Sequence, residues 1–208
     1  MRFFVLLISA IWLIGPMQAQ EQRDSVRYSA GFVFRDGIYL NFPAFRDNAP
    51  NIPMGVLTTA QGQRVTDLGS SGKLFYPDSA GKSIRLDLDQ AWGFCANGIV
   101  YIRGESSFSR IGIMGSLAHL VVDATHRNMD PYMFGGGTTY TVEEQRFLDM
   151  TTGAFLSVTA SGIYKVISKD EVLKEEFDAL SYKERNKPET VFLFMRRYND
   201  RHPLYFPR

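Results

Sequence analysis

The segment AWGFCANGIVYIR, residues 91–103, decides the fold that we expect for this chain. Asn97-Gly98 lies between two apolar runs and predicts a hairpin, because both residues accept the positive φ that a type I′ turn requires. The turn fixes the register and predicts three cross-strand pairs: Ala96 with Ile99, Phe94 with Tyr101, and Trp92 with Arg103. Both faces of this hairpin are apolar, so we expect it inside a sheet.

The segments around the hairpin favour sequential antiparallel strands. Residues 83–89 alternate apolar and charged side chains, as a strand with one solvated face does. Residues 108–114 and 117–124 are typical of the next two strands, and short turns favour pairing in chain order. Residues 146–158 predict a hairpin about residues 151–153, and residues 32–40 predict another about Asp36-Gly37.

Helices are predicted near both ends. Asn41 is a good N-cap for a short helix through Asn48, with Pro43 in its first turn. Residues 168–171 resemble a capping box, and the apolar spacing that follows predicts a helix. Residues 186–199 suit a further helix, although residues 191–194 also suit a strand. Residues 160–167 suit either structure.

Length and composition indicate one globular domain. The chain has 208 residues, of which 45% are hydrophobic and 22% charged. We therefore expect a single α+β domain over residues 20–208: an antiparallel, meander-rich sheet with one short N-terminal helix and two C-terminal helices. Cys95 is the only cysteine, so no disulfide can form within the chain.

Residues 1–19 have the pattern of a cleaved secretory signal peptide. Arg2 precedes an uncharged apolar run over residues 3–14, which Gly15-Pro16 ends, and Ala19 precedes the expected cut. The run is too short to span a membrane, and no transmembrane segment is expected in the mature chain. The sequence thus predicts export to the periplasm, the outer envelope or the medium.

The charge of the mature chain argues against nucleic acid as a partner. The chain has 23 Lys and Arg residues and 22 Asp and Glu residues, and Arg2 leaves with the signal peptide. The formal charge of the mature protein is then zero, which provides no electrostatic attraction for nucleic acid.

Four motifs resemble those of a group of uncharacterised exported proteins from Bacteroidetes-type bacteria. They are residues 37–42 with Phe45, Asn48 and Pro50; Trp92-Gly93 before the Gly98 hairpin; Asp149 with Thr152-Gly153; and Tyr-Asn-Asp-Arg-His-Pro at 198–203. The resemblance spans most of the mature chain. It implies a periplasmic or outer-envelope location, favours helix for both C-terminal segments, and implies no activity because none is known for the group.

The polar residues do not form a recognisable catalytic or metal motif. His119 and Asp123 would lie about 13 Å apart on one strand, which is too far for a shared metal ion, so we expect no metal and no cofactor. No Gly-x-Ser-x-Gly is present, and catalytic residues stay unassigned. Cys95 suits a small buried thiol better than a nucleophile. Asp87 and Asp89 suit a solvated strand face, with a glycosidase-like pair as the alternative.

One aromatic surface is a candidate binding site: Trp92, Phe94 and Tyr101, rimmed by Arg103. If it belongs to the core instead, we expect Arg103 to lie across a buried Trp92 ring. The sequence thus predicts an exported envelope protein acting as a non-enzymatic binding or interaction module for an unknown protein or a small apolar ligand. The alternatives are an exported hydrolase that uses carboxylate or histidine side chains, and a closed β-barrel that carries an apolar ligand.

Overall fold

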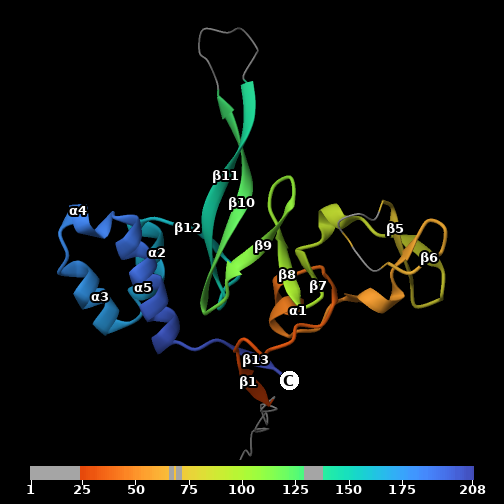
Figure 1. Cartoon of the computed structure of the whole chain (residues 1–208), viewed down its shortest axis with the longest axis horizontal. Coiled ribbons are helices and arrows are strands. Elements are labelled where there is room, and N and C mark those ends of the chain that lie inside the picture. The colour runs from red at the N-terminus through yellow and green to blue at the C-terminus, as the bar shows by residue number, and fades with distance from the viewer. Residues whose placement is uncertain (1–23, 66–67, 69–71, 129–137) are drawn as a thin grey trace, which may run out of the picture.

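Figure 1 shows the computed structural model, which describes residues 24–65, 68, 72–128 and 138–208. Central strands stand between a group of helices and a small three-stranded sheet, and the terminal strands β1 (Ser25–Arg27) and β13 (Tyr205–Pro207) pair near the C-terminus. The predicted signal peptide lies outside the described residues. So does most of the segment 128–139, for which the sequence predicts a flexible loop.

The main sheet has eight antiparallel strands in the order β12-β11-β10-β9-β8-β7-β2-β3. Strands β7 to β12 thus lie side by side in chain order. The strands are β2 (Gly37–Tyr39), β3 (Ile52–Pro53), β7 (Gly93–Ala96), β8 (Ile99–Arg103), β9 (Phe108–Ile113), β10 (Leu117–Asn128), β11 (Thr138–Asp149) and β12 (Phe155–Ser157). Strands β12 and β3 are the two edges of this sheet, so the sheet is open. The carrier alternative predicted a closed barrel instead.

The hairpin predicted for residues 91–103 is confirmed. Phe94 pairs with Tyr101 and Ala96 pairs with Ile99, in the register that the turn requires. Asn97 and Gly98 both have positive φ, at 53° and 73°. The Arg103 amide donates to the Trp92 carbonyl at 2.9 Å, which extends the ladder by one step.

Two predicted strand arrangements are wrong. Residues 83–89 do not join the main sheet: β6 (Ser83–Arg85) pairs with β5 (Leu74–Pro77), which pairs with β4 (Thr58–Thr59). The alternation stops because the Asp87 carboxylate accepts from the Asp89 amide and starts the 3-10 helix η2 (Leu88–Gln90). Residues 32–34 form no hairpin with β2 either, because β2 lies between β3 and β7.

The described residues form five α-helices, where the sequence predicted three and left residues 160–167 open. They are α1 (Phe42–Arg46), α2 (Ala160–Ile167), α3 (Glu171–Asp178), α4 (Tyr182–Arg185) and α5 (Pro188–Arg201), with a 3-10 turn η1 (Met54–Val56). The strand alternatives for α2 and residues 191–194 are therefore wrong. No helix among the described residues is long and apolar enough to cross a membrane.

Polar side chains cap the helices, and the sequence predicted only some of these caps correctly. Asn41 caps α1 and Thr159 caps α2, each by accepting a backbone N–H. The predicted capping box at residues 168–171 is wrong, because Ser168 ends α2 and Asp170 caps α3. The capping box lies instead at Ser181 and Glu184, where it starts α4.

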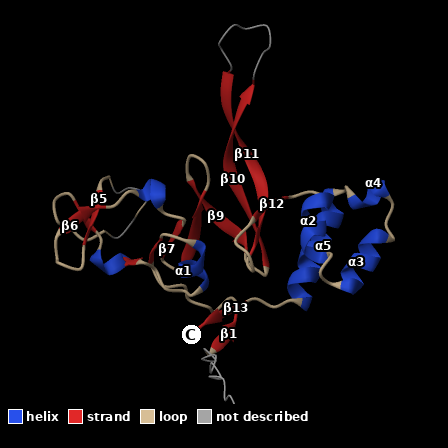
Figure 2. Cartoon of the chain, turned by 180° about the vertical axis from the view of Figure 1, so that it is seen from behind, coloured by secondary structure: helices blue, strands red, loops and turns tan. Residues whose placement is uncertain are grey.

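Three apolar clusters hold these elements together. One joins α1, β13 and one face of β7–β10, and contains Cys95 and Phe206. The second packs α2, α3 and α5 against the start of β10 and the end of β11. The third joins the three-stranded sheet to β7 and β8. Figure 2 shows α2–α5 on one side of the central strands and β5–β6 on the other, with α1 beside β7. The chain therefore has an α+β fold with antiparallel sheets.

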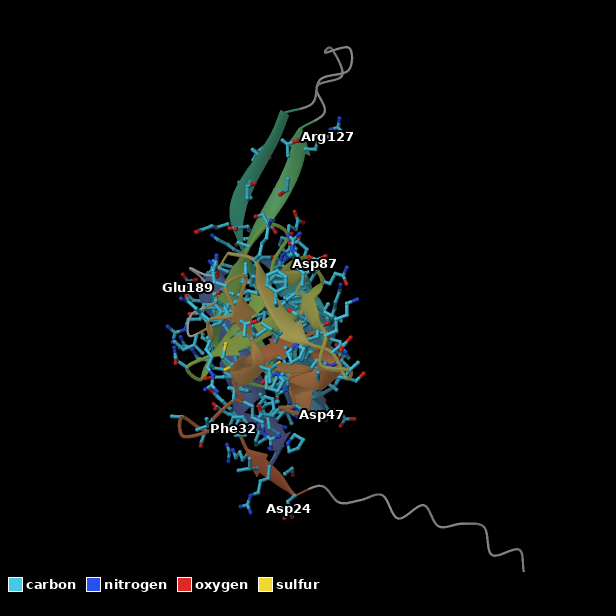
Figure 3. The ribbon with its side chains drawn as sticks, turned by 90° about the vertical axis from the view of Figure 1, so that its right-hand side faces the viewer. Asp24, Phe32, Asp47, Asp87, Arg127 and Glu189 are labelled. Carbon is cyan, nitrogen blue, oxygen red and sulfur yellow. The ribbon has the colours of Figure 1, made fainter. Side chains whose placement is uncertain are left out.

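The hairpin of β10 and β11 extends well beyond the body of the molecule. Its two strands pair over their full length, from Leu117 with Asp149 to Asn128 with Thr138. In the side view of Figure 3, Arg127 lies near the end of this hairpin, far from Asp24 at the opposite end of the described chain.

Candidate functional site

A hollow of about 480 Å³ opens where β7 and β8 meet the loops beside them. We call it the aromatic hollow. Its lining is mainly apolar and comprises Leu68, Leu88, Phe94, Ala96, Asn97, Ile99, Tyr101, Ser107 and Phe108. The pleat of the hairpin explains the lining, because Cys95, Val100 and Ile102 point into the first apolar cluster, while the alternate side chains point to the other face, where they pack in the third cluster and line the hollow.

Three aromatic rings form the main wall of the hollow. Phe94 and Tyr101 are cross-strand partners, and their rings stack with centroids 4.7 Å apart and planes 18° apart. Phe108, at the start of β9, meets Phe94 edge to face at 5.0 Å. Such ring pairs hold their geometry through complementary quadrupoles as well as apolar contact. The sequence identified Phe94 and Tyr101 as a pair, but Phe108 joins them only through the pairing of β9 with β8.

Arg103 fixes one side of this wall. Its Nη2 lies 2.7 Å from the Asp89 carboxylate and its Nη1 donates to the Leu88 carbonyl at 3.0 Å. Its guanidinium lies over the Phe108 ring, 5.5 Å from the centroid. Arg103 therefore ties η2 to β8 and β9, and covers Phe108 instead of the ring that the sequence predicted.

Trp92 does not belong to the aromatic hollow. Its ring stacks on Phe45 at 4.9 Å and lies against Phe42 at 5.6 Å, in the cluster around α1. Trp92 lies just before β7 begins. The alternation of side chains along β7, which turns Phe94 toward the hollow, therefore does not fix the orientation of the Trp92 side chain. The expectation that Arg103 lies across Trp92 is therefore wrong, although Trp92 is partly buried.

The histidines of β10 bind separate partners. His119 lies 3.1 Å from Gln145, and His126 lies 2.6 Å from Glu144. Side chains alternate between the two faces along a strand, and His119 and His126 are an odd number of residues apart. The two imidazoles therefore lie on opposite faces of the hairpin. The described residues contain no group of three or more His, Cys, Asp or Glu side chains that could hold a metal ion.

A polar cluster that the sequence did not predict lies at the end of α5. The buried Asp170 carboxylate accepts from Arg201 Nε at 2.6 Å and lies 2.8 Å from His202 Nε2. The Arg201 bonds hold the pKa of this carboxyl well below its usual range. Tyr198 stacks on the His202 ring at 4.4 Å. Because Asp170 also caps α3, we interpret the cluster as a fastening between α3 and α5.

Cys95 is held as a neutral thiol. It is fully buried, and its Sγ lies 3.2 Å from the Asp36 carboxylate. Burial, together with the hydrogen bond and negative charge of Asp36, raises the pKa of Cys95 to about 12. The thiolate that nucleophilic catalysis requires is therefore scarce at neutral pH.

Comparison with known proteins gave no match to a protein-family model, to a curated protein or to a solved structure.

Proposed function

We propose that this chain is an exported, non-enzymatic binding module of the cell envelope, and that its aromatic hollow receives a small apolar ligand. The single observation that carries this proposal is the hollow lined by the packed rings of Phe94, Tyr101 and Phe108, of which Phe94 is buried while Tyr101 and Phe108 are partly exposed. A volume of about 480 Å³ falls within the range of small-molecule pockets. Burial of apolar ligand surface against the rings would supply the binding free energy.

The rim of the hollow supports a small ligand with one polar end. Asn97 and Ser107 are the polar side chains in the lining, and Arg103 lies beside Phe108. The hydrolase alternative has less support, because His119 and His126 face away from each other and Cys95 is a neutral buried thiol. Location in the envelope rests on the signal-peptide pattern of residues 1–19.

A filling substitution tests the site. Purified residues 20–208 are titrated with anilinonaphthalene sulfonate, an anionic dye with apolar aromatic rings, whose fluorescence rises when the rings bind an apolar site. Ala96→Phe places a ring in the hollow and should weaken dye binding about tenfold, the loss of about 1.4 kcal/mol. The matched control, Val142→Phe, adds the same ring on the exposed part of β11 and should bind as the wild type does.

Trp92 verifies that the filled variant folds. It is the only tryptophan of residues 20–208 and lies with Phe42 and Phe45, outside the hollow. Its emission should be the same in both variants and the wild type. Equal dye affinity for Ala96→Phe and wild type would refute the hollow as the site. Export is tested separately by intact mass, and an exported protein that retained residues 1–19 would contradict it.

A further inference from the structure

We propose that a cleft among α2, α3 and α4 binds a neutral oligosaccharide. The cleft has a volume of about 570 Å³ and is lined by Ala160, Ser161, Tyr164, Phe177, Asp178, Tyr182, Arg185 and Asn186. We call it the tyrosine cleft. It lies in the helical part of the molecule, on the other side of β9–β11 from the three-stranded sheet, and it goes beyond the function proposed for the aromatic hollow (Figure 1).

Tyr182 provides an aromatic surface that the fold does not use. It is 83% exposed, the largest exposure among the exposed large hydrophobic side chains of the described residues. The capping box of Ser181 and Glu184 fixes the short helix that carries it. Tyr164 lines the same cleft, with its ring 6.0 Å from that of the buried Phe177. The C–H faces of a pyranose can pack on such rings and lose water there.

Polar side chains with fixed positions surround the two tyrosines. The Asp178 carboxylate accepts from Lys174 Nζ at 2.8 Å and lies 3.8 Å from Arg185 Nη1. Arg185 is itself held, because its Nε donates to the Leu180 carbonyl at 3.0 Å. Asn186 Nδ2 donates to the Tyr182 carbonyl at 2.8 Å. Carboxylate, guanidinium and amide groups together supply the donors and acceptors that sugar hydroxyls need.

The mixture of groups selects against other ligand classes. A purely apolar ligand would remove water from Asp178 and Arg185 without replacing their hydrogen bonds, which is costly. An anionic ligand would meet the Asp178 carboxylate, whose pKa the Lys174 hydrogen bond lowers, and it would have to compete with that carboxylate for Lys174 and Arg185. A neutral polyol with an apolar face meets both the rings and the charged side chains, and the cleft volume is that of a small-molecule site.

Ligand-observed saturation-transfer NMR tests this site with two probes, cellotriose and the trisaccharide of N-acetylglucosamine. At least one should bind the wild type at about 10 mM or below. Tyr182→Ala and Asp178→Asn should each weaken that binding about tenfold. Tyr140→Ala, which removes a tyrosine that is 51% exposed on β11, is the matched control and should bind as the wild type does.

Two outcomes would overturn the assignment. One is the absence of binding of either trisaccharide to the wild type at that concentration. The other is an affinity that falls with Tyr182→Ala but not with Asp178→Asn, because an exposed ring alone would then account for it. Ala96→Phe, which fills the aromatic hollow, should leave trisaccharide binding unchanged, so failure of one site is distinguishable from failure of the other.

Discussion

The side-chain amide of Asn199 bonds both backbone groups of Leu117, 82 residues away in the chain. Its Oδ1 accepts from the Leu117 N–H at 2.7 Å and its Nδ2 donates to the Leu117 carbonyl at 3.0 Å. The side chain thus replaces a neighbouring strand at the start of β10. A Cβ at Gly115 would lie 2.4 Å from Asn199 Nδ2, so a side chain at residue 115 would displace the amide from these two bonds. These contacts fasten α5 to the main sheet.

Asn199→Ala should lower the free energy of unfolding by about 1–3 kcal/mol, because two partly buried backbone groups lose their partner. Asn199→Asp should be at least as damaging, since a carboxylate oxygen would then face the Leu117 carbonyl. Urea denaturation measures both. The neighbouring exposed Asp200→Ala is the control and should change stability by less than about 0.5 kcal/mol. A wild-type midpoint for Asn199→Ala would show that the bonds contribute little.

The Asp170 cluster should make stability depend on pH in the acid range. Its folded pKa lies below the unfolded value, so the ionised carboxylate favours the folded state. This contribution is fully present above the ordinary aspartate pKa of about 3.9 and is lost as the pH falls below it. Asp170→Asn should therefore be less stable than the wild type at neutral pH, and the difference should shrink at low pH. A difference that stays constant across this range would contradict the prediction.

The Cys95 thiol should resist iodoacetamide in the folded protein and react readily in denaturant. Its pKa is raised to about 12, so little thiolate exists near neutral pH, and burial blocks access to Sγ. Asp36→Asn removes the neighbouring negative charge and should lower the thiol pKa, while the buried side chain keeps the reaction slow. The labelled fraction is measured by intact mass. Rapid labelling of the native protein would revive Cys95 as a nucleophile.

The sequence predicts local features well where one turn or one cap determines them. Asn97-Gly98 sets the hairpin that carries Phe94 and Tyr101, and Thr159 selects helix for a segment that its apolar pattern left open. Asp36-Gly37 has the same local signal but forms no hairpin. A Cβ at Gly37 would lie 2.5 Å from the Ile52 carbonyl, so this glycine serves the approach of β3 instead.

Features that depend on distant segments were not predictable. Phe108 lines the aromatic hollow only because β9 pairs with β8. Trp92 packs instead in the apolar cluster around α1. The tyrosine cleft needs three short helices to meet, one of which has only four residues. The motif at residues 198–203 can be recognised in the sequence. Its role in joining α5 to α3 and β10 depends on contacts with Asp170 and Leu117, which only the fold reveals.

Glu105 should protect the edge of β10 where this strand leaves the main sheet. Strand β9 pairs with β10 only at His119 and Leu120. Beyond them, Glu105 Oε2 accepts from the Thr125 N–H at 2.6 Å, and the Glu105 N–H donates to the Asp123 carbonyl at 3.4 Å. Glu105 thus bonds, through its side chain and its own backbone, a backbone N–H and a carbonyl of β10 that could otherwise pair with another strand.

Glu105→Ala should remove the acceptor of the Thr125 amide and speed its hydrogen exchange about tenfold, the equivalent of one hydrogen bond of about 1.4 kcal/mol. Amide exchange followed by NMR measures this rate. Glu143→Ala removes an exposed carboxylate from β11, at the position that pairs with Asp123, and is the matched control, for which the Thr125 rate should not change. Because the edge becomes accessible, the Glu105 variant should also self-associate more readily than the control. An unchanged Thr125 rate in Glu105→Ala would show that the edge is protected by other means.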